Sequence, residues 1–307
     1  MKFGIAKGAR VKLRHVETWL RCRRIDLSKK LSASVRGRKL VIDFLPRNVT
    51  ELTVDCGDHR LVVSPHELIG RHVVAKGHYS RDRVSDLLSE LDSRGALPER
   101  GGCLLEIGAN IGTHTVYFAV TGRFGRIVSV EPDPRNLSFL RKNVALNGIT
   151  ELVQIIECAA GEGEGELSLH RVAGNYGNSS FLHTHPTGDS VIVSVRPVDA
   201  ILATAGISEE SISLVWMDIE GFEPQAVKSM LGLLKRQVPL YIEFTPELYG
   251  AEGTRAFVNS LAQHYDECIV MKNSGKETMA VRQLISLGRQ CDVLFLPGQS
   301  SVTPGDG

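Results

Sequence analysis

The sequence predicts an α/β protein in which one mostly parallel sheet is covered by helices on both faces. The chain has 307 residues and is 42% apolar, which is enough for a large buried core. From residue 98 onward, short apolar runs of strand length alternate with segments of helical spacing. Several runs are continuously apolar, which is typical of parallel strands buried on both faces.

Three regions follow from the chain order. Residues 1–40 are expected to form a basic arm, since they hold 13 Lys or Arg and two acidic residues, a net charge of +11. Residues 41–97 are expected to form a small β-hairpin and helix extension. Short strand-like runs occur at 39–43, 51–55 and 59–63, and turn chemistry separates the last two. Apolar residues at 84, 87, 88 and 91 predict a helix over 82–91.

Residues 98–300 are expected to form the main domain. Strands are predicted at 103–107, 126–130, 152–156, 166–171, 191–196, 212–219, 239–244, 267–272 and 291–297. Helices are predicted at 113–120, 134–147, 224–234 and 253–264. Ligands bind such sheets at the carboxyl ends of the strands. The residues that carry chemistry should therefore lie in the turns that follow strands.

Composition and charge exclude several classes of protein. The net charge of +1 and the apolar content exclude a wholly disordered chain. No apolar run approaches the roughly 18–20 residues of a membrane-spanning helix. Charges interrupt residues 1–20, so we expect no secretory signal and a cytoplasmic protein, although an Arg-rich arm is also compatible with an organelle transit peptide. The arm itself suggests peripheral contact with an anionic membrane, or a solvated tail.

The first motif is the turn after the strand at 103–107. Gly108 and Gly112 permit a tight turn, and Glu106 stands at the strand end, with Asn110 between the glycines. The spacing is not the dinucleotide pattern GxGxxG, and the acid would repel a pyrophosphate. The turn suits a cationic ligand such as S-adenosylmethionine, or is a plain turn between a strand and a helix.

The second motif, Glu131-Pro132-Asp133-Pro134, follows the next strand. An acid in this position can accept both ribose hydroxyls of a nucleoside. Because Pro134 suits the first turn of a helix, we assign Asp133 to helix capping and Glu131 to the ribose.

Acidic residues also follow two later strands. Asp218, Glu220 and Glu223 come after the strand at 212–219, and Glu243 ends the strand at 239–244. Neighbouring parallel strands should bring Asp218 and Glu243 together, as part of a site or of a salt-bridged surface.

These motifs, in this order, resemble the FkbM family of S-adenosylmethionine-dependent methyltransferases. The resemblance rests on Glu106 to Gly112, on Glu131 to Pro134 with Leu140, Asn143 and Asn147 downstream, on Asp218 to Glu223, and on Ile242 to Phe244. It covers about residues 72–297. The family tends to have Asp where this chain has Glu106 and Lys two residues before Asp218, where this chain has Trp216.

The resemblance implies a Rossmann-like, seven-stranded methyltransferase sheet and methyl transfer to a hydroxyl of a sugar, glycolipid or secondary metabolite. We expect these residues to contact the cofactor: Glu106, Gly108, Asn110, Gly112, Thr113, Glu131, Ala159 and Asp218. Asp218 and Glu243 are the first candidates for base or orienting group, followed by His185 and His183 in the polar loop between two strands. The acids are also ligands that Mg²⁺ accepts, but no metal-ligand spacing is recognisable, so no metal is expected.

Two other functions remain open on the residues alone. One is a nicotinamide-dependent oxidoreductase on a similar sheet, which the broken glycine pattern disfavours. The other is a non-catalytic adaptor that binds S-adenosylmethionine, which the retained acids disfavour. A nucleic-acid partner is not expected, because no aromatic residues accompany a basic patch.

Overall fold

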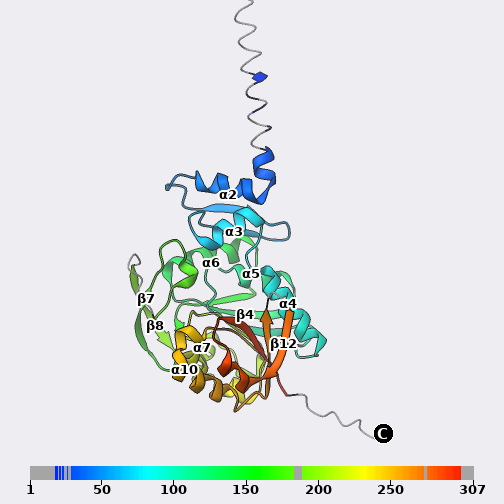
Figure 1. Ribbon diagram of the computed structural model, residues 1–307, viewed down its shortest axis with the longest axis vertical. Helices are drawn as coiled ribbons and strands as arrows, with labels where there is room; N and C mark the ends of the chain where they lie inside the picture. The colour runs from blue at the N-terminus through cyan, green and yellow to red at the C-terminus, as the bar shows by residue number, and fades with distance from the viewer. Residues whose placement is uncertain are drawn as a thin grey trace, which may run out of the picture.

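The computed structural model describes residues 18–19, 21, 23, 26, 29–182, 189–272 and 275–298. Its centre is a sheet of eight strands in the order β12-β11-β13-β10-β9-β3-β4-β5 (Figure 1). The strands are β3 (Gly102–Ile107), β4 (Phe124–Val130), β5 (Val153–Ile156), β9 (Ile212–Met217), β10 (Leu240–Phe244), β11 (Glu267–Lys272), β12 (Gly275–Ala280) and β13 (Cys291–Phe295).

The predicted fold class is confirmed. Parallel pairing joins β10, β9, β3, β4 and β5, whereas β13, β11 and β12 pair antiparallel. The sheet has one strand more than the seven expected, because β12 adds to its edge. That strand escaped prediction because five of its six residues are exposed and no apolar alternation marks it.

Helices cover both faces of the sheet. The helices α4 (Arg81–Ser93), α5 (Thr113–Val120) and α6 (Pro134–Leu146) pack on one face. The helices α7 (Val198–Ala205), α8 (Glu223–Val227), α9 (Leu231–Lys235) and α10 (Pro246–Leu261) pack on the other. Neighbouring residues of strand β9 point to opposite faces. Trp216 packs in the apolar cluster under α4, α5 and α6, whereas Met217 packs in the cluster under α7 to α10.

Two helices differ from the sequence expectation. The single helix predicted over 224–234 is divided into α8 and α9, with Met230 in a non-helical conformation at the start of the second. Helix α10 begins seven residues before the predicted start at 253, and Gly250 interrupts it at a φ of 69°. Pro246 in its first turn marks the true start, since proline is compatible with that position.

The region before β3 contains α2 (Val35–Asp43), a hairpin of β1 (Leu52–Asp55) and β2 (Arg60–Val63), and α3 (Leu68–Lys76). The hairpin is as predicted. The prediction of a strand at 39–43 is wrong, because these residues belong to helix α2. Ser34 caps this helix by accepting a hydrogen bond from the Gly37 N–H at 3.0 Å. The expected boundary after residue 40 therefore falls inside a helix.

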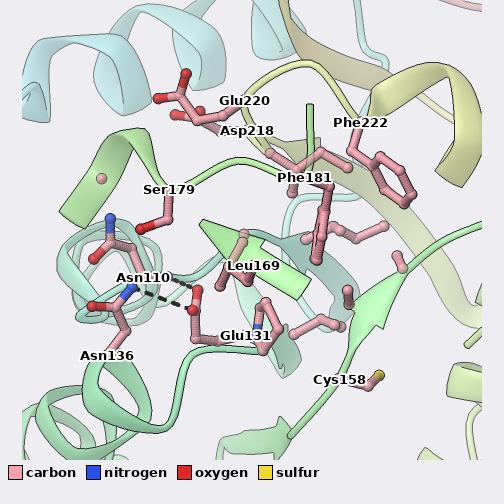
Figure 2. Close-up of a pocket in the computed structure, with 18 residues that line it drawn as sticks. Asn110, Glu131, Asn136, Cys158, Leu169, Ser179, Phe181, Asp218, Glu220 and Phe222 are labelled. Carbon is pink, nitrogen blue, oxygen red and sulfur yellow. Dashed lines mark hydrogen bonds between the residues drawn. The ribbon is translucent and has the colours of Figure 1, made fainter. Parts of the chain in front are cut away.

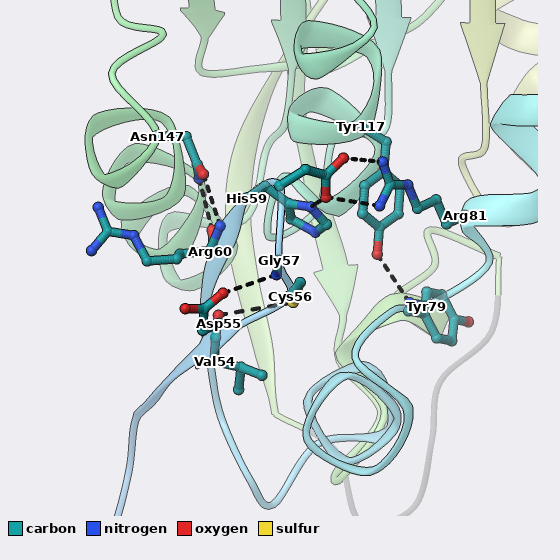
Figure 3. A network of polar contacts seen from close by, with 11 residues as sticks. Val54, Asp55, Cys56, Gly57, His59, Arg60, Tyr79, Arg81, Tyr117 and Asn147 are labelled. Carbon is teal, nitrogen blue, oxygen red and sulfur yellow. Dashed lines mark hydrogen bonds and ion pairs between the residues drawn. The ribbon is translucent and has the colours of Figure 1, made fainter.

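The hairpin is held to the main domain by two asparagines of the α6 region. The Asn143 side chain accepts from the Val62 N–H at 2.6 Å and donates to the Ile111 carbonyl at 2.7 Å. Asn147 accepts a hydrogen bond from the Arg60 N–H at 2.9 Å. Figure 3 shows this hydrogen bond and the ion pair that Arg81 of α4 forms with the hairpin turn. Helix α4 shares its apolar cluster with Trp216, so no break in the core marks the boundary expected after residue 97.

A second, smaller sheet lies beside the carboxyl end of the main one. It contains β6 (Ala159–Ala160), β8 (Ser190–Arg196) and β7 (Gly165–His170), and the 3-10 helix η1 (Tyr176–Asn178) lies between β7 and β8 in the chain. Further 3-10 helices are η2 (Glu209–Ser211) and η3 (Val281–Ser286). Among the described residues, no helix is both long and apolar enough to cross a bilayer.

Candidate functional site

Two adjoining cavities open at the carboxyl ends of the central strands. The first spans about 520 Å³, counted with the open space at its mouth, and the turns after β3, β4, β5 and β9 contribute to its wall. The second spans about 730 Å³, counted in the same way, and extends toward α4 and β10. Their linings share residues of two turns and of η1: Gly108, Asn110, Gly177, Asp218 and Glu220. The two acids therefore stand where the cavities meet.

The turn after β3 brings the backbone close to the turn after β9. Gly108 has a φ of 90°, and a Cβ on it would lie 2.0 Å from the Asp218 carbonyl oxygen. Only glycine fits this crossing, which fixes Asp218 against the first turn. The Asp218 N–H also donates to the Ile107 carbonyl at 3.0 Å, so the backbone of the acid is held in place.

Glu131 is a buried carboxylate with a fixed orientation in the wall of the first cavity (Figure 2). It accepts hydrogen bonds from the Asn110 N–H at 2.8 Å, the Asp133 N–H at 2.9 Å and the Asn136 amide at 3.3 Å. Burial raises its pKa to about 7, and these donors oppose that rise. A carboxylate has about four acceptor sites, so Glu131 retains capacity for a hydroxyl donor in the cavity.

Asp133 caps α6, as predicted. Its Oδ1 accepts from the Arg135 N–H at 2.8 Å, and Arg171 of the smaller sheet donates to both its carboxylate oxygens.

Two predicted cofactor contacts are not at the cavity surface. Glu106 is fully buried and lines neither cavity, because its side chain accepts from the Thr115 hydroxyl at 2.6 Å and the Ser129 hydroxyl at 2.7 Å. Gly112 packs on α6 instead, since a Cβ there would meet Leu140 at 2.6 Å. Both residues support the turn, and their contact with a cofactor stays a prediction.

The rest of the first cavity is mostly apolar. The Phe181 and Phe222 rings lie with their centroids 4.8 Å apart, and Cys158, Ala159 and Leu169 continue this wall. Such a surface suits the faces of a flat aromatic base. Ala159 was predicted here, whereas the phenylalanines were not, because no sequence pattern places the loop after β7 beside the turn after β9.

The second cavity is polar and acidic. Asp218, Glu220 and Glu243 each place a carboxylate oxygen within 4.8 Å of the others, an arrangement that could hold a divalent cation. Burial, then the Glu243 charge, raises the pKa of Asp218 well above its ordinary value. Burial and Glu243 likewise raise the pKa of Glu220 to about 8. One or more of these acids therefore holds a proton near neutral pH.

A cation from α4 faces this acidic group. The Arg83 guanidinium lies 3.5 Å from the Glu243 carboxylate and 3.2 Å from that of Asp292. Its charge lowers the pKa of Asp218 and of Glu220, against the larger effect of burial. No sequence pattern indicates Arg83, because it lies in a helix 160 residues before Glu243 and belongs to no motif.

Two more residues of this cavity were missed. Tyr79 precedes α4, and His114 lies in the first turn of α5 beside predicted Thr113, which also lines the cavity. Burial lowers the pKa of His114 to about 3, so its imidazole is neutral at physiological pH. The carboxylates remain the better bases among the described lining residues.

The fourth acid, Glu223, has a structural role. Its fully buried carboxylate accepts from the Ile219 N–H at 3.1 Å and the Tyr249 hydroxyl at 2.9 Å, which holds the acidic turn closed. His183 and His185, predicted as alternative bases, lie outside the described residues.

Comparisons with known proteins agree with this arrangement of motifs. The sequence profile of the methyltransferase FkbM domain matches residues 106–279. The 2-O-methyltransferase NoeI of Sinorhizobium fredii is 26% identical over an alignment of 175 residues, and the match covers 52% of this chain and 70% of NoeI.

Solved structures give weaker similarities. Methyltransferase FkbM from Methylobacillus flagellatus is 19% identical with a TM-score of 0.41, over 64% of this chain and 43% of that one. The chain thus spans less than half of that relative. The O-methyltransferase TomG from Streptomyces achromogenes, solved with S-adenosylmethionine, is 15% identical with a TM-score of 0.40, over 70% of this chain and 80% of TomG.

Proposed function

The chain belongs to the FkbM family of methyltransferases, and from this premise we propose that it methylates a hydroxyl oxygen with S-adenosylmethionine as donor. The acceptor would be a sugar, glycolipid or secondary metabolite. The observation that carries the proposal is the meeting of a mostly apolar cavity, walled in part by Glu131, and a polar cavity at Asp218 and Glu220. NoeI, named as a 2-O-methyltransferase, supports transfer to oxygen.

The first cavity fits the parts of S-adenosylmethionine. Glu131 offers its carboxylate to the ribose hydroxyls, and the wall at Phe222 offers an apolar face to the adenine. The close backbone contact at Gly108 holds Asp218 at the edge of this cavity. The acids at the junction complement a positive charge on the ligand.

The bound donor supplies a methyl group on a positively charged sulfur, which is a good leaving group without help from the protein. The protein must align the acceptor hydroxyl and remove its proton. Asp218 is placed to accept that proton, because it borders both cavities and its raised pKa makes its carboxylate a stronger base than an ordinary one. Glu220 and Glu243 would orient neighbouring hydroxyls of the acceptor, and Arg83 limits the repulsion among the three acids.

We place this activity in the cytoplasm. This proposal is supported by the five described cysteines, which are free, as is usual for thiols in a reducing compartment.

The test begins with calorimetry and ends with a product. Purified protein should bind S-adenosylhomocysteine and not NAD. Binding of NAD without S-adenosylhomocysteine would instead support the nicotinamide-dependent oxidoreductase. Labelled S-adenosylmethionine is then incubated with extracts of polysaccharides, glycolipids and secondary metabolites, and the labelled product is identified by mass. A methyl ether supports the proposal. Methylation of nitrogen or carbon would refute the oxygen assignment, and binding without any transfer would favour the adaptor.

A further inference from the structure

Helix α2 presents an apolar surface away from the rest of the protein. Leu40, Val41 and Phe44 are 46%, 48% and 80% exposed, whereas Ile42 is 2% exposed. With about 3.6 residues per turn, the three exposed residues fall on one side of the helix, roughly opposite Ile42. We call Leu40, Val41 and Phe44 the α2 surface.

Helix α2, which carries these exposed residues, is held firmly on helix α3. Arg38 donates a hydrogen bond from its guanidinium to the Ala75 carbonyl of α3 at 2.6 Å, and Asp43 forms an ion pair with Arg71 of the same helix. These contacts hold Ile42 inward and the α2 surface outward. Scattered apolar residues are normal on protein surfaces, but an adjacent group that includes a four-fifths exposed phenylalanine indicates a binding surface.

Exposed basic residues lie on α2 and close to it in the sequence. Arg36 and Lys39 of α2 and Arg47 after it are exposed. Arg23 lies 4.5 Å from the ring centroid of Trp19, itself 54% exposed. Residues 1–40 carry a net charge of +11, while residues 41–307 carry −10. The positive charge of the sequence is thus concentrated in the segment that leads into α2, and α2 itself lies at the end of the molecule beyond α3 (Figure 1).

Apolar residues together with Lys, Arg and Trp are the composition of helices that lie at a membrane interface. The apolar side chains enter the boundary between headgroups and acyl chains, and the cations attract anionic lipid. A second copy of the chain is disfavoured as the occupant, because it would bring two strongly positive regions together. Nucleic acid would leave Leu40, Val41 and Phe44 without an apolar partner.

We propose that the α2 surface and the basic residues around it dock the protein on a bilayer that contains anionic lipid. Helix α3, on which α2 packs, contributes Ile69 to the second cavity. Docking would therefore hold that cavity near the lipid headgroups, where an acceptor carried on a lipid could reach it. The docking itself does not depend on the proposed methyl transfer.

The experiment is co-sedimentation of the full chain with vesicles. Vesicles of phosphatidylcholine alone are compared with vesicles that also contain phosphatidylserine, at low and high salt. We expect binding to the anionic vesicles that weakens with salt. Val41→Ser/Phe44→Ser should lower the partition coefficient about tenfold or more, as the loss of a buried Phe side chain predicts. Arg36→Glu/Lys39→Glu should lower it through charge.

Exposed apolar residues elsewhere provide the control. Ile192 is 62% exposed on β8 and Leu231 is 53% exposed on α9, so Ile192→Ser/Leu231→Ser should bind like the unaltered chain. Thermal unfolding of each variant establishes that it is folded. Undiminished binding by folded Val41→Ser/Phe44→Ser, equal binding to neutral vesicles, or no binding would overturn the proposal. So would a concentration-dependent dimer, seen by sedimentation velocity, that Phe44→Ser dissociates.

Discussion

Arg83 of α4 lies 3.5 Å from the carboxylate of Glu243 at the end of β10, and it is the cation that faces three clustered acids. Its charge lowers the pKa of Asp218 and Glu220, so its removal should raise both. For Arg83→Ala we expect the acidic limb of the pH–rate profile to move upward by about one pH unit, with lower turnover at neutral pH. Arg83→Lys should restore part of the original profile.

Arg81 provides a matched control for this prediction. It lies on the same helix with the same side-chain exposure of 36%, but its partner is Asp58 in the hairpin turn. Arg81→Lys should leave the profile in place. An unchanged profile in Arg83→Ala would show that the acids are insensitive to this cation.

The buried acids Glu131 and Glu106 allow a paired test of cofactor binding. Burial raises the pKa of both to about 7, but only Glu131 lines a cavity. Glu131→Gln should weaken S-adenosylhomocysteine binding roughly ten- to 150-fold, the effect of about 1.5–3 kcal/mol in hydrogen bonds to a charged group. Glu106→Gln should leave the affinity nearly unchanged. Calorimetry measures the S-adenosylhomocysteine affinity of both folded variants. An equal loss of affinity in the two would contradict the separate roles of Glu131 and Glu106.

Asp218→Asn tests the chemical step. The change keeps the side-chain shape but removes the site that accepts a proton, so turnover should fall by about 10²–10⁴-fold. The affinity for S-adenosylhomocysteine should change much less, and Glu243→Gln should reduce turnover more weakly. Wild-type turnover in Asp218→Asn would move the base elsewhere, with His185 next to be replaced. Loss of wild-type turnover on chelation, restored by Mg²⁺, would assign the acids to a metal.

Glu220 should lower stability in a defined pH range. Its pKa is about 8 in the folded protein against an ordinary 4.5, so the folded state retains a proton that the unfolded state loses between these values. Stability must therefore fall as the pH rises from about 4.5 to 8, and the cost is fully present above 8. Glu220→Gln should raise the melting temperature at pH 9 and leave it nearly unchanged at pH 4. Equal shifts at both pH values would contradict this.

The sequence predicts the central strands well because β9 and its neighbours are buried on both faces and appear as continuous apolar runs. Where burial is incomplete, the prediction fails. The apolar run Leu40 to Ile42 is short and fits either a strand or a helix. Its contacts with α3 favour the helical conformation, which is observed as α2. In β12 only Met279 is partly buried, so nothing distinguishes it from a loop.

The same distinction explains which site residues the sequence predicts. Asp218 and Glu243 could be placed together because the ends of neighbouring parallel strands converge. Arg83, Tyr79 and Phe181 could not, because they reach the cavities from a helix, a turn and a loop whose positions depend on packing across the whole chain. Glu106 has the expected place at a strand end, but its side chain turns toward two hydroxyls inside the fold.

A crystal structure with S-adenosylhomocysteine tests the central claim most directly. We expect adenine against the wall at Phe222, a ribose hydroxyl on the Glu131 carboxylate, and the sulfur at the opening beside Asp218, facing the second cavity. A nucleoside bound elsewhere, or a sulfur turned away from Asp218, would contradict the account.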